Sequence, residues 1–128
     1  MELRITREEI RQKLLDWQSS KISECDLKNW AEYLLDNGVK LEDWDSDWNS
    51  VSSEILHSLE SLDMNLLIQL DIPIFLDFLK TDPNNFAAGF KILDQYFKRI
   101  NYRQRQAVLK NNKFYSLYCD SKSCKCSD

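Results

Sequence analysis

Residues 6–38 read TREEIRQKLLDWQSSKISECDLKNWAEYLLDNG and carry the start and stop signals of two helices. Thr6 and Ser23 each begin a capping box, in which a hydroxyl and an acid three residues later bind backbone N–H groups that the first helical turn leaves free. Gly38 is a stop signal, because glycine adopts the left-handed backbone conformation without steric cost. The stretch therefore predicts an antiparallel helical hairpin, whose first helix ends near Gln18.

Apolar residues recur along both predicted helices at the spacing that places them on one helical face. Similar spacing continues towards the C-terminus and predicts further short helices around one core. The apolar positions are Ile10, Leu14, Leu15 and Trp17 in the first helix; Leu27, Trp30, Ala31, Leu34 and Leu35 in the second; Val51, Ile55, Leu59 and Leu62 in the third; Ile74, Phe75, Phe78 and Leu79 in the fourth; and Phe86, Phe90, Leu93 and Phe97 in the fifth.

Caps and prolines predict where the later helices begin. Asp47 is a suitable cap for the third helix, and Asn101 for a sixth. Pro73 and Pro83 suit the first turns of the fourth and fifth helices, where the missing N–H of proline costs nothing. The faces of the sixth helix follow from its composition. We expect an inner face of Tyr102, Ala107 and Val108 and an outer face of Arg103, Arg105 and Lys110.

The composition agrees with this helical pattern. The chain has 128 residues, which suits one domain, and it has only two glycines and two prolines. Such scarcity disfavours a β-sandwich, which needs many tight turns. We therefore predict an all-α protein, with a single compact domain of five to seven short helices that begins with the helical hairpin. This domain is expected to span residues 1–118, followed by a poorly ordered, cysteine-containing tail at residues 119–128.

The ends and the hydropathy of the chain predict its compartment. The N-terminus becomes charged within a few residues and lacks the continuous apolar core of a signal peptide. No stretch approaches the roughly 20 apolar residues of a membrane span. We therefore expect a cytoplasmic protein without membrane contact, whose four cysteines are reduced thiols.

Charge is distributed unevenly along the chain, although the net charge is only −4. Residues 1–64 hold 15 acids and 7 bases, whereas residues 65–128 hold 6 acids and 10 bases. Within the first half, residues 31–63 carry nine acids and a single base, Lys40. Charge asymmetry of this kind indicates an electrostatic partner rather than a particular fold.

The strongest candidate for a binding site is the acidic segment, residues 42–48, within the stretch LEDWDSDWNS. Its acids must be exposed at least in part, because burying an unpaired carboxylate is costly. Its two tryptophans have two alternatives: they pack back on the core, where tryptophan is usually found, or one stands at the surface as a binding hot spot ringed by acids. The candidate partner-binding residues are Glu42, Asp43, Trp44, Asp45, Asp47, Trp48 and Glu54, and Asp36 and Glu60 would extend the patch.

Metal binding and catalysis have weaker signals. Three cysteines near the C-terminus resemble part of a zinc site, but the paired C-x2-C spacing is missing and the fourth ligand would have to be Cys25 or His57. No nucleophile, phosphate-loop or metalloprotease motif occurs. We therefore expect no enzyme activity and no cofactor. The weak metal candidates are Cys119, Cys124 and Cys126.

A basic face in the second half offers an alternative function as an RNA- or DNA-binding helical module. Basic stripes with interleaved aromatic residues bind phosphates, but such domains are usually basic overall, and this chain has a pI near 5.0. A nucleic-acid ligand is therefore the second choice. The face would comprise Lys91, Lys98, Arg99, Arg103, Arg105, Lys110 and Lys113, with Tyr96, Tyr102 and Tyr115.

The phrases ITREEIRQKLLDWQSSKIS, residues 5–23, and LKNWAEYLLDNGV, residues 27–39, resemble the opening hairpin of small helical immunity proteins. Bacteria encode such proteins beside nuclease toxins, including those of contact-dependent growth inhibition. The resemblance implies a non-catalytic inhibitor, whose acidic, tryptophan-containing surface covers the active site of a basic cognate toxin. It carries over no binding residue by position, so the candidate residues depend on the acidic cluster. The basic second half leaves open the alternative that the toxin is bound by another face of the protein.

Overall fold

Thr6 caps the first helix in the computed structural model of the chain, which describes residues 3–41 and 50–119. The N–H of Glu9 donates to Thr6 Oγ1 at 3.1 Å, and the N–H of Thr6 donates to Glu9 Oε1 at 2.9 Å. Ser23 and Asp26 form the same reciprocal pair. Both predicted capping boxes are confirmed, and Gly38 has the positive φ of 66° that favours glycine after a helix.

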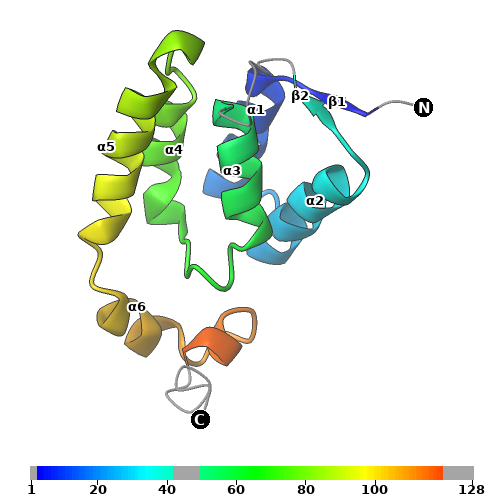
Figure 1. Ribbon diagram of the computed structural model, residues 1–128. Helices are drawn as coiled ribbons and strands as arrows, with labels where there is room; N and C mark the ends of the chain where they lie inside the picture. Colours follow the sequence, from blue (N-terminus) through cyan, green and yellow to red (C-terminus); the bar gives the residue numbers. More distant parts are fainter. Residues whose placement is uncertain (1–2, 42–49, 120–128) are drawn as a thin grey trace.

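The described residues form an all-α fold, as predicted (Figure 1). The α-helices and 3-10 helices follow one another along the chain, and α4 lies between α1 and α5. Their bounds are α1 Arg7–Gln18, α2 Glu24–Asp36, α3 Val51–Glu60, η1 Gln69–Asp71, α4 Ile72–Phe78, η2 Pro83–Asn85, α5 Phe86–Lys98, α6 Tyr102–Leu109 and η3 Ser116–Tyr118.

One short parallel pair of strands was not predicted. Strand β1, Arg4–Ile5, pairs with β2, Lys40–Leu41, so that Arg4 lies opposite Lys40. The pair joins the start of α1 to the chain that follows α2 (Figure 1). Two-residue strands are too short to show the alternating pattern from which strands are predicted.

The core lies where α1 to α4 meet. Trp17 of α1, Leu27 of α2, Ile55 of α3 and Phe75 of α4 are all fully buried. The second helix packs more closely on α3 than on α1. The apolar faces predicted for α1 to α4 therefore supply most of the core, and α5 adds Leu93 from its inner side.

The cap of α3 differs from the prediction. Ser50, not Asp47, is the residue before the first helical turn, and its Oγ accepts from the N–H of Ser53 at 3.2 Å. Serine and aspartate are almost equally good caps, so the residue type alone does not decide which of the two begins the helix. Ser50 is buried, whereas Asp47 lies outside the described residues.

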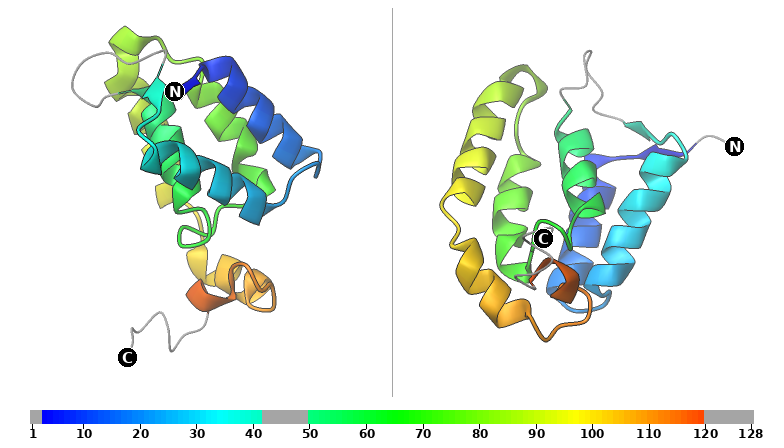
Figure 2. Two further views of the ribbon diagram at one scale, coloured as in Figure 1. Left: turned by 90° about the vertical axis from the view of Figure 1, so that its right-hand side faces the viewer. Right: turned by 60° about the horizontal axis from the view of Figure 1, so that its bottom comes forward.

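The orientation of α6 is also different from the prediction. Tyr102, Ala107 and Val108 were expected to face inward, yet all three are exposed. Arg105 was expected to face outward, yet its side chain is only 11% exposed. Figure 2 shows that α6 and η3 project from one end of the bundle, so this helix has little apolar core to cover. Asn101 does cap it, by accepting from the N–H of Gln104 at 3.0 Å.

Across residues 3–41 and 50–119, no helix is both long enough and apolar enough to cross a lipid bilayer.

Candidate binding surfaces

Most of the predicted partner-binding residues are outside the part of the chain that the structure describes. These residues are Glu42, Asp43, Trp44, Asp45, Asp47 and Trp48. Their predicted role in binding therefore stays a prediction, and so do both alternatives for the tryptophans. Of the seven candidate partner-binding residues, Glu54 alone belongs to the described residues, and it lies in the first turn of α3.

The carboxyl group of Glu54 is half-buried, so it lies only partly on the outer side of α3. Burial raises its pKa above the ordinary value, and the carboxylate of Asp94 raises it further, while His57 lowers it. Among the described residues, no side chain forms an ion pair or hydrogen bond with this carboxylate. Glu54 is therefore an acid at the start of α3 whose charge is poorly compensated.

The other two acids considered for this patch occupy different environments. Asp36, at the end of α2, is exposed. The carboxylate of Glu60, at the end of α3, lies 3.6 Å from Nδ1 of His57. His57 is exposed on the same helix.

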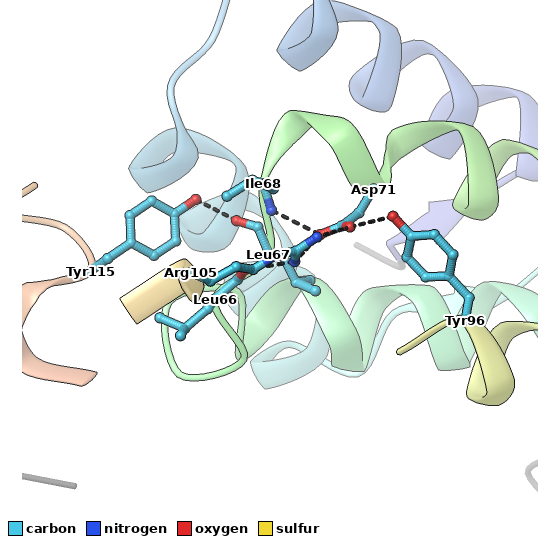
Figure 3. A network of polar contacts seen from close by, with 7 residues as sticks. All are labelled: Leu66, Leu67, Ile68, Asp71, Tyr96, Arg105 and Tyr115. Atoms are coloured by element: carbon cyan, nitrogen blue, oxygen red, sulfur yellow. Dashed lines mark hydrogen bonds and ion pairs between the residues drawn. The ribbon is translucent and has the colours of Figure 1, made fainter. Parts of the chain in front are cut away.

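A buried ion pair holds α6 to the rest of the fold (Figure 3). Asp71, fully buried at the start of α4, accepts two hydrogen bonds from the guanidinium of Arg105, at 2.7 and 2.8 Å. Its Oδ2 also accepts from the N–H of Ile68, and its Oδ1 accepts from the hydroxyl of Tyr96. Every oxygen of this buried carboxylate therefore has a donor, which is the condition for burying a charge.

Two further contacts extend this network. Arg105 donates to the carbonyl oxygen of Leu66 at 3.1 Å, and Tyr115 donates to the carbonyl oxygen of Leu67. Leu66 has a positive φ of 53°, a backbone conformation that residues other than glycine rarely adopt. The two hydrogen bonds therefore hold a strained loop in place. Burial, with the Asp71 carboxylate beside it, raises the pKa of Tyr96 to about 12, and burial also raises the pKa of Tyr115. Both hydroxyls therefore remain protonated donors at neutral pH.

The network weakens the case for a nucleic-acid face. Arg105 donates its hydrogen bonds to Asp71 and Leu66 within the protein, and Tyr115 is buried. Neither side chain is therefore available to a phosphate or a base. Lys98 is exposed, but its Nζ lies 2.8 Å from Asp94. Those three members of the predicted face are therefore committed to contacts within the protein.

Two hollows lie on either side of α6. The aliphatic groove has a volume of about 660 Å³ between η1 and α4, α5 and α6, and its outer edge carries Leu70, Ile92 and Val108. The mixed groove has a volume of about 510 Å³ on the other side of α6 and is edged by Met64, Tyr102 and Leu117.

The exposed large apolar side chains gather at these hollows. Of the eight such side chains in the described residues, six border one groove or the other. Only Tyr33, on α2, and Phe90, on α5, do not. Single exposed apolar residues are ordinary, but clusters mark interaction surfaces. This cluster was not predicted. Its one signal in the sequence is Ile92, an aliphatic residue that lies off the predicted apolar stripe of α5.

The predicted metal ligands are not assembled in the described residues. Cys25 is exposed on α2, and Cys119 packs at the edge of the core after η3. Cys124 and Cys126 lie outside the described residues. Within the described ranges, no group of three or more histidine, cysteine or acidic side chains lies close enough to hold a metal ion.

Comparisons with known proteins identify no relative: no family model, no curated protein and no solved structure matches the chain.

Proposed function

We propose that this protein is a non-catalytic inhibitor that binds a cognate bacterial toxin, a nuclease, and covers its active site with an acidic surface. The observation that carries the proposal is Glu54, a half-buried carboxylate that forms no ion pair or hydrogen bond with another described side chain and has only the exposed His57 as a favourable charge nearby. Such a group gains more from a partner's Lys or Arg than a fully solvated acid does, because its water is already partly removed. The resemblance of residues 5–39 to immunity proteins supports the choice of partner.

The division of charge along the chain supports the same mechanism. A nuclease binds phosphates and therefore presents a basic cleft, which the acids of residues 31–63 would attract. Attraction between opposite surface potentials raises the association rate, and buried anchors lower the dissociation rate. Trp44 and Trp48 are the proposed anchors. Inhibition of this kind needs tight binding and no turnover.

Neutralising three acids of the segment is expected to slow toxin binding. The variant Asp43→Asn, Asp45→Asn, Asp47→Asn should lower the association rate constant by about tenfold or more at low salt, because charge steers the encounter. The toxin is first obtained by pull-down with tagged protein from the source organism, and binding is then measured by surface plasmon resonance over a range of salt concentrations. The thermal midpoint should stay close to that of the wild type.

A second variant removes the same charge outside residues 31–63: Glu8→Gln, Asp16→Asn, Asp77→Asn. Of these acids, Glu8 and Asp77 are exposed, and Asp16 lies on α1, where its side chain accepts a hydrogen bond from Gln12. This control should bind at nearly the wild-type rate. Equal loss in both variants would show that net charge, not the acidic segment, steers the partner. Failure to capture any toxin would contradict the function itself.

Replacing Glu54 by glutamine is expected to weaken toxin binding and to stabilise the free protein slightly. The pKa of Glu54 is raised in the folded state, so its ionisation destabilises the fold as the pH rises through that pKa. The gain in thermal midpoint should therefore be present at pH 7 and shrink as the pH falls towards the pKa that Glu54 has in the unfolded chain. Differential scanning calorimetry between pH 3.5 and 7.5 measures it. A loss of stability at pH 7 would mean that the carboxylate is compensated.

A further inference from the structure

We infer that the aliphatic groove beside α6 is a docking surface for an amphipathic helix of a partner protein, with an aliphatic stripe flanked by acidic residues. Three of the elements that form the groove, η1, α5 and α6, bring Leu70, Ile92 and Val108 to its edge. Those side chains are 73%, 61% and 75% exposed, so the fold leaves them largely in water. Covering them would gain hydrophobic free energy that the isolated chain does not have.

The walls of the groove favour a helix as the occupant. They are helices, η1 with α4 on one side and α5 with α6 on the other, and no described strand borders the groove. The β1–β2 pair lies at the other end of the fold (Figure 1), so strand addition has no edge to use here. A hydrophobic groove between helices accepts an amphipathic helix through side chains at i, i+3 or i+4, and i+7.

The charges around the groove favour acidic flanks on that helix. Its lining contains Arg99 and Arg105 and no acid. Arg105 is neutralised by Asp71, whereas Arg99 is exposed and has no ion pair with another described residue. Residues 91–113 as a whole carry seven bases and one acid, Asp94, which pairs with Lys98. A partner with carboxylates beside its aliphatic stripe therefore meets complementary charge.

Amides at the groove suit the same occupant. Gln95 of α5 and Gln104 of α6 are exposed in the lining, where they can hydrogen-bond carboxylates or polar groups at the rim of the contact. The inference goes beyond the proposed toxin contact, because it concerns a surface of opposite charge built from other helices. It requires neither the acidic segment nor a toxin.

The test uses a synthetic peptide of about 16 residues, helical, with leucines at i, i+4 and i+7 and glutamates on both flanks. A second peptide has lysine in place of every glutamate. Binding of each labelled peptide to the full chain is measured by fluorescence anisotropy. The acidic peptide is expected to bind, and Ile92→Asp to weaken it by about tenfold or more, because the variant places a charge in the aliphatic edge. Arg99→Glu should weaken the acidic peptide and strengthen the basic one.

Tyr33→Asp is the matched control, because Tyr33 is 58% exposed on α2 and borders neither groove. It should leave peptide binding unchanged. Equal affinity for the acidic and basic peptides, or an equal effect of Tyr33→Asp and Ile92→Asp, would overturn the inference. So would a dimer, seen by sedimentation, that forms at low micromolar protein and is abolished by Ile92→Asp, since the groove would then belong to a second copy of the chain. Circular dichroism checks that each variant is folded.

Discussion

Asp71→Ala is expected to lower the free energy of unfolding by about 3–5 kcal/mol, because it leaves the charge of Arg105 desolvated and without its partner. The side chain of Asp71 is completely buried, and that of Arg105 is 11% exposed. The substitution also removes the acceptor for the N–H of Ile68 and for the hydroxyl of Tyr96. The loss should appear in urea unfolding followed by circular dichroism, with α6 the first element to lose protection from hydrogen exchange.

Asp77→Ala is the matched control for this prediction. Asp77 lies on α4, the helix that follows Asp71, but it is exposed, so its substitution should change stability by less than about 0.5 kcal/mol. A double variant, Asp71→Leu with Arg105→Met, removes both charges and should recover much of the loss, since an apolar pair has no unpaired charge to bury. An Asp71→Ala variant as stable as Asp77→Ala would show that the ion pair does not hold α6 in place.

Trp17→Ala is expected to lower the free energy of unfolding by about 3–5 kcal/mol, because it opens a large cavity in the core. Trp17 is fully buried near the end of α1. Its Nε1–H donates to Glu24 Oε2 at 2.8 Å, which links α1 to the first turn of α2, and its carbonyl oxygen accepts from Gln69 at 2.6 Å. The substitution removes the ring and its donor, and Glu24 loses its partner. Equilibrium unfolding in urea measures the effect.

Trp30→Ala is the comparison that separates burial from residue type. Trp30 is half-buried on α2, with Nζ of Lys13 5.5 Å from its ring centroid. Its loss should cost clearly less, since part of the ring is already in water and the cation–π contact is worth about 0.5–1 kcal/mol at exposed sites. Equal losses for the two variants would contradict the assignment of Trp17 to the centre of the core.

The local signals along the chain predicted the helices well. The two capping boxes, the stop at Gly38 and the cap at Asn101 each depend on contacts within four residues, so they can be read without knowing the fold. The apolar stripe of α1 was equally readable, because Ile10, Leu14 and Trp17 recur at helical spacing and are all buried.

Contacts between distant residues were not predictable in this way. The side chain of Arg105 looked like one more solvated base of α6, and only the fold brings it to Asp71, 34 residues away. The same event removed Arg105 from the predicted nucleic-acid face. The cap of α3 was not predicted either, because Ser50 and Asp47 are both good caps by residue type and only the fold shows that Ser50 precedes the first turn.

The two candidate binding surfaces differ in whether the sequence or the tertiary structure reveals them. The acids and tryptophans of residues 42–48 can be recognised from the sequence alone, because charged and large apolar residues alternate within one short stretch. The aliphatic groove cannot be recognised from the sequence, because Leu70, Ile92 and Val108 lie on three different helices and each is ordinary by itself. The apolar periodicity of a helix depends on residues that are close in the sequence, so it can be recognised without the fold. The meeting of three helix faces depends on how the ion pair positions α6, and that arises only when the whole fold has formed.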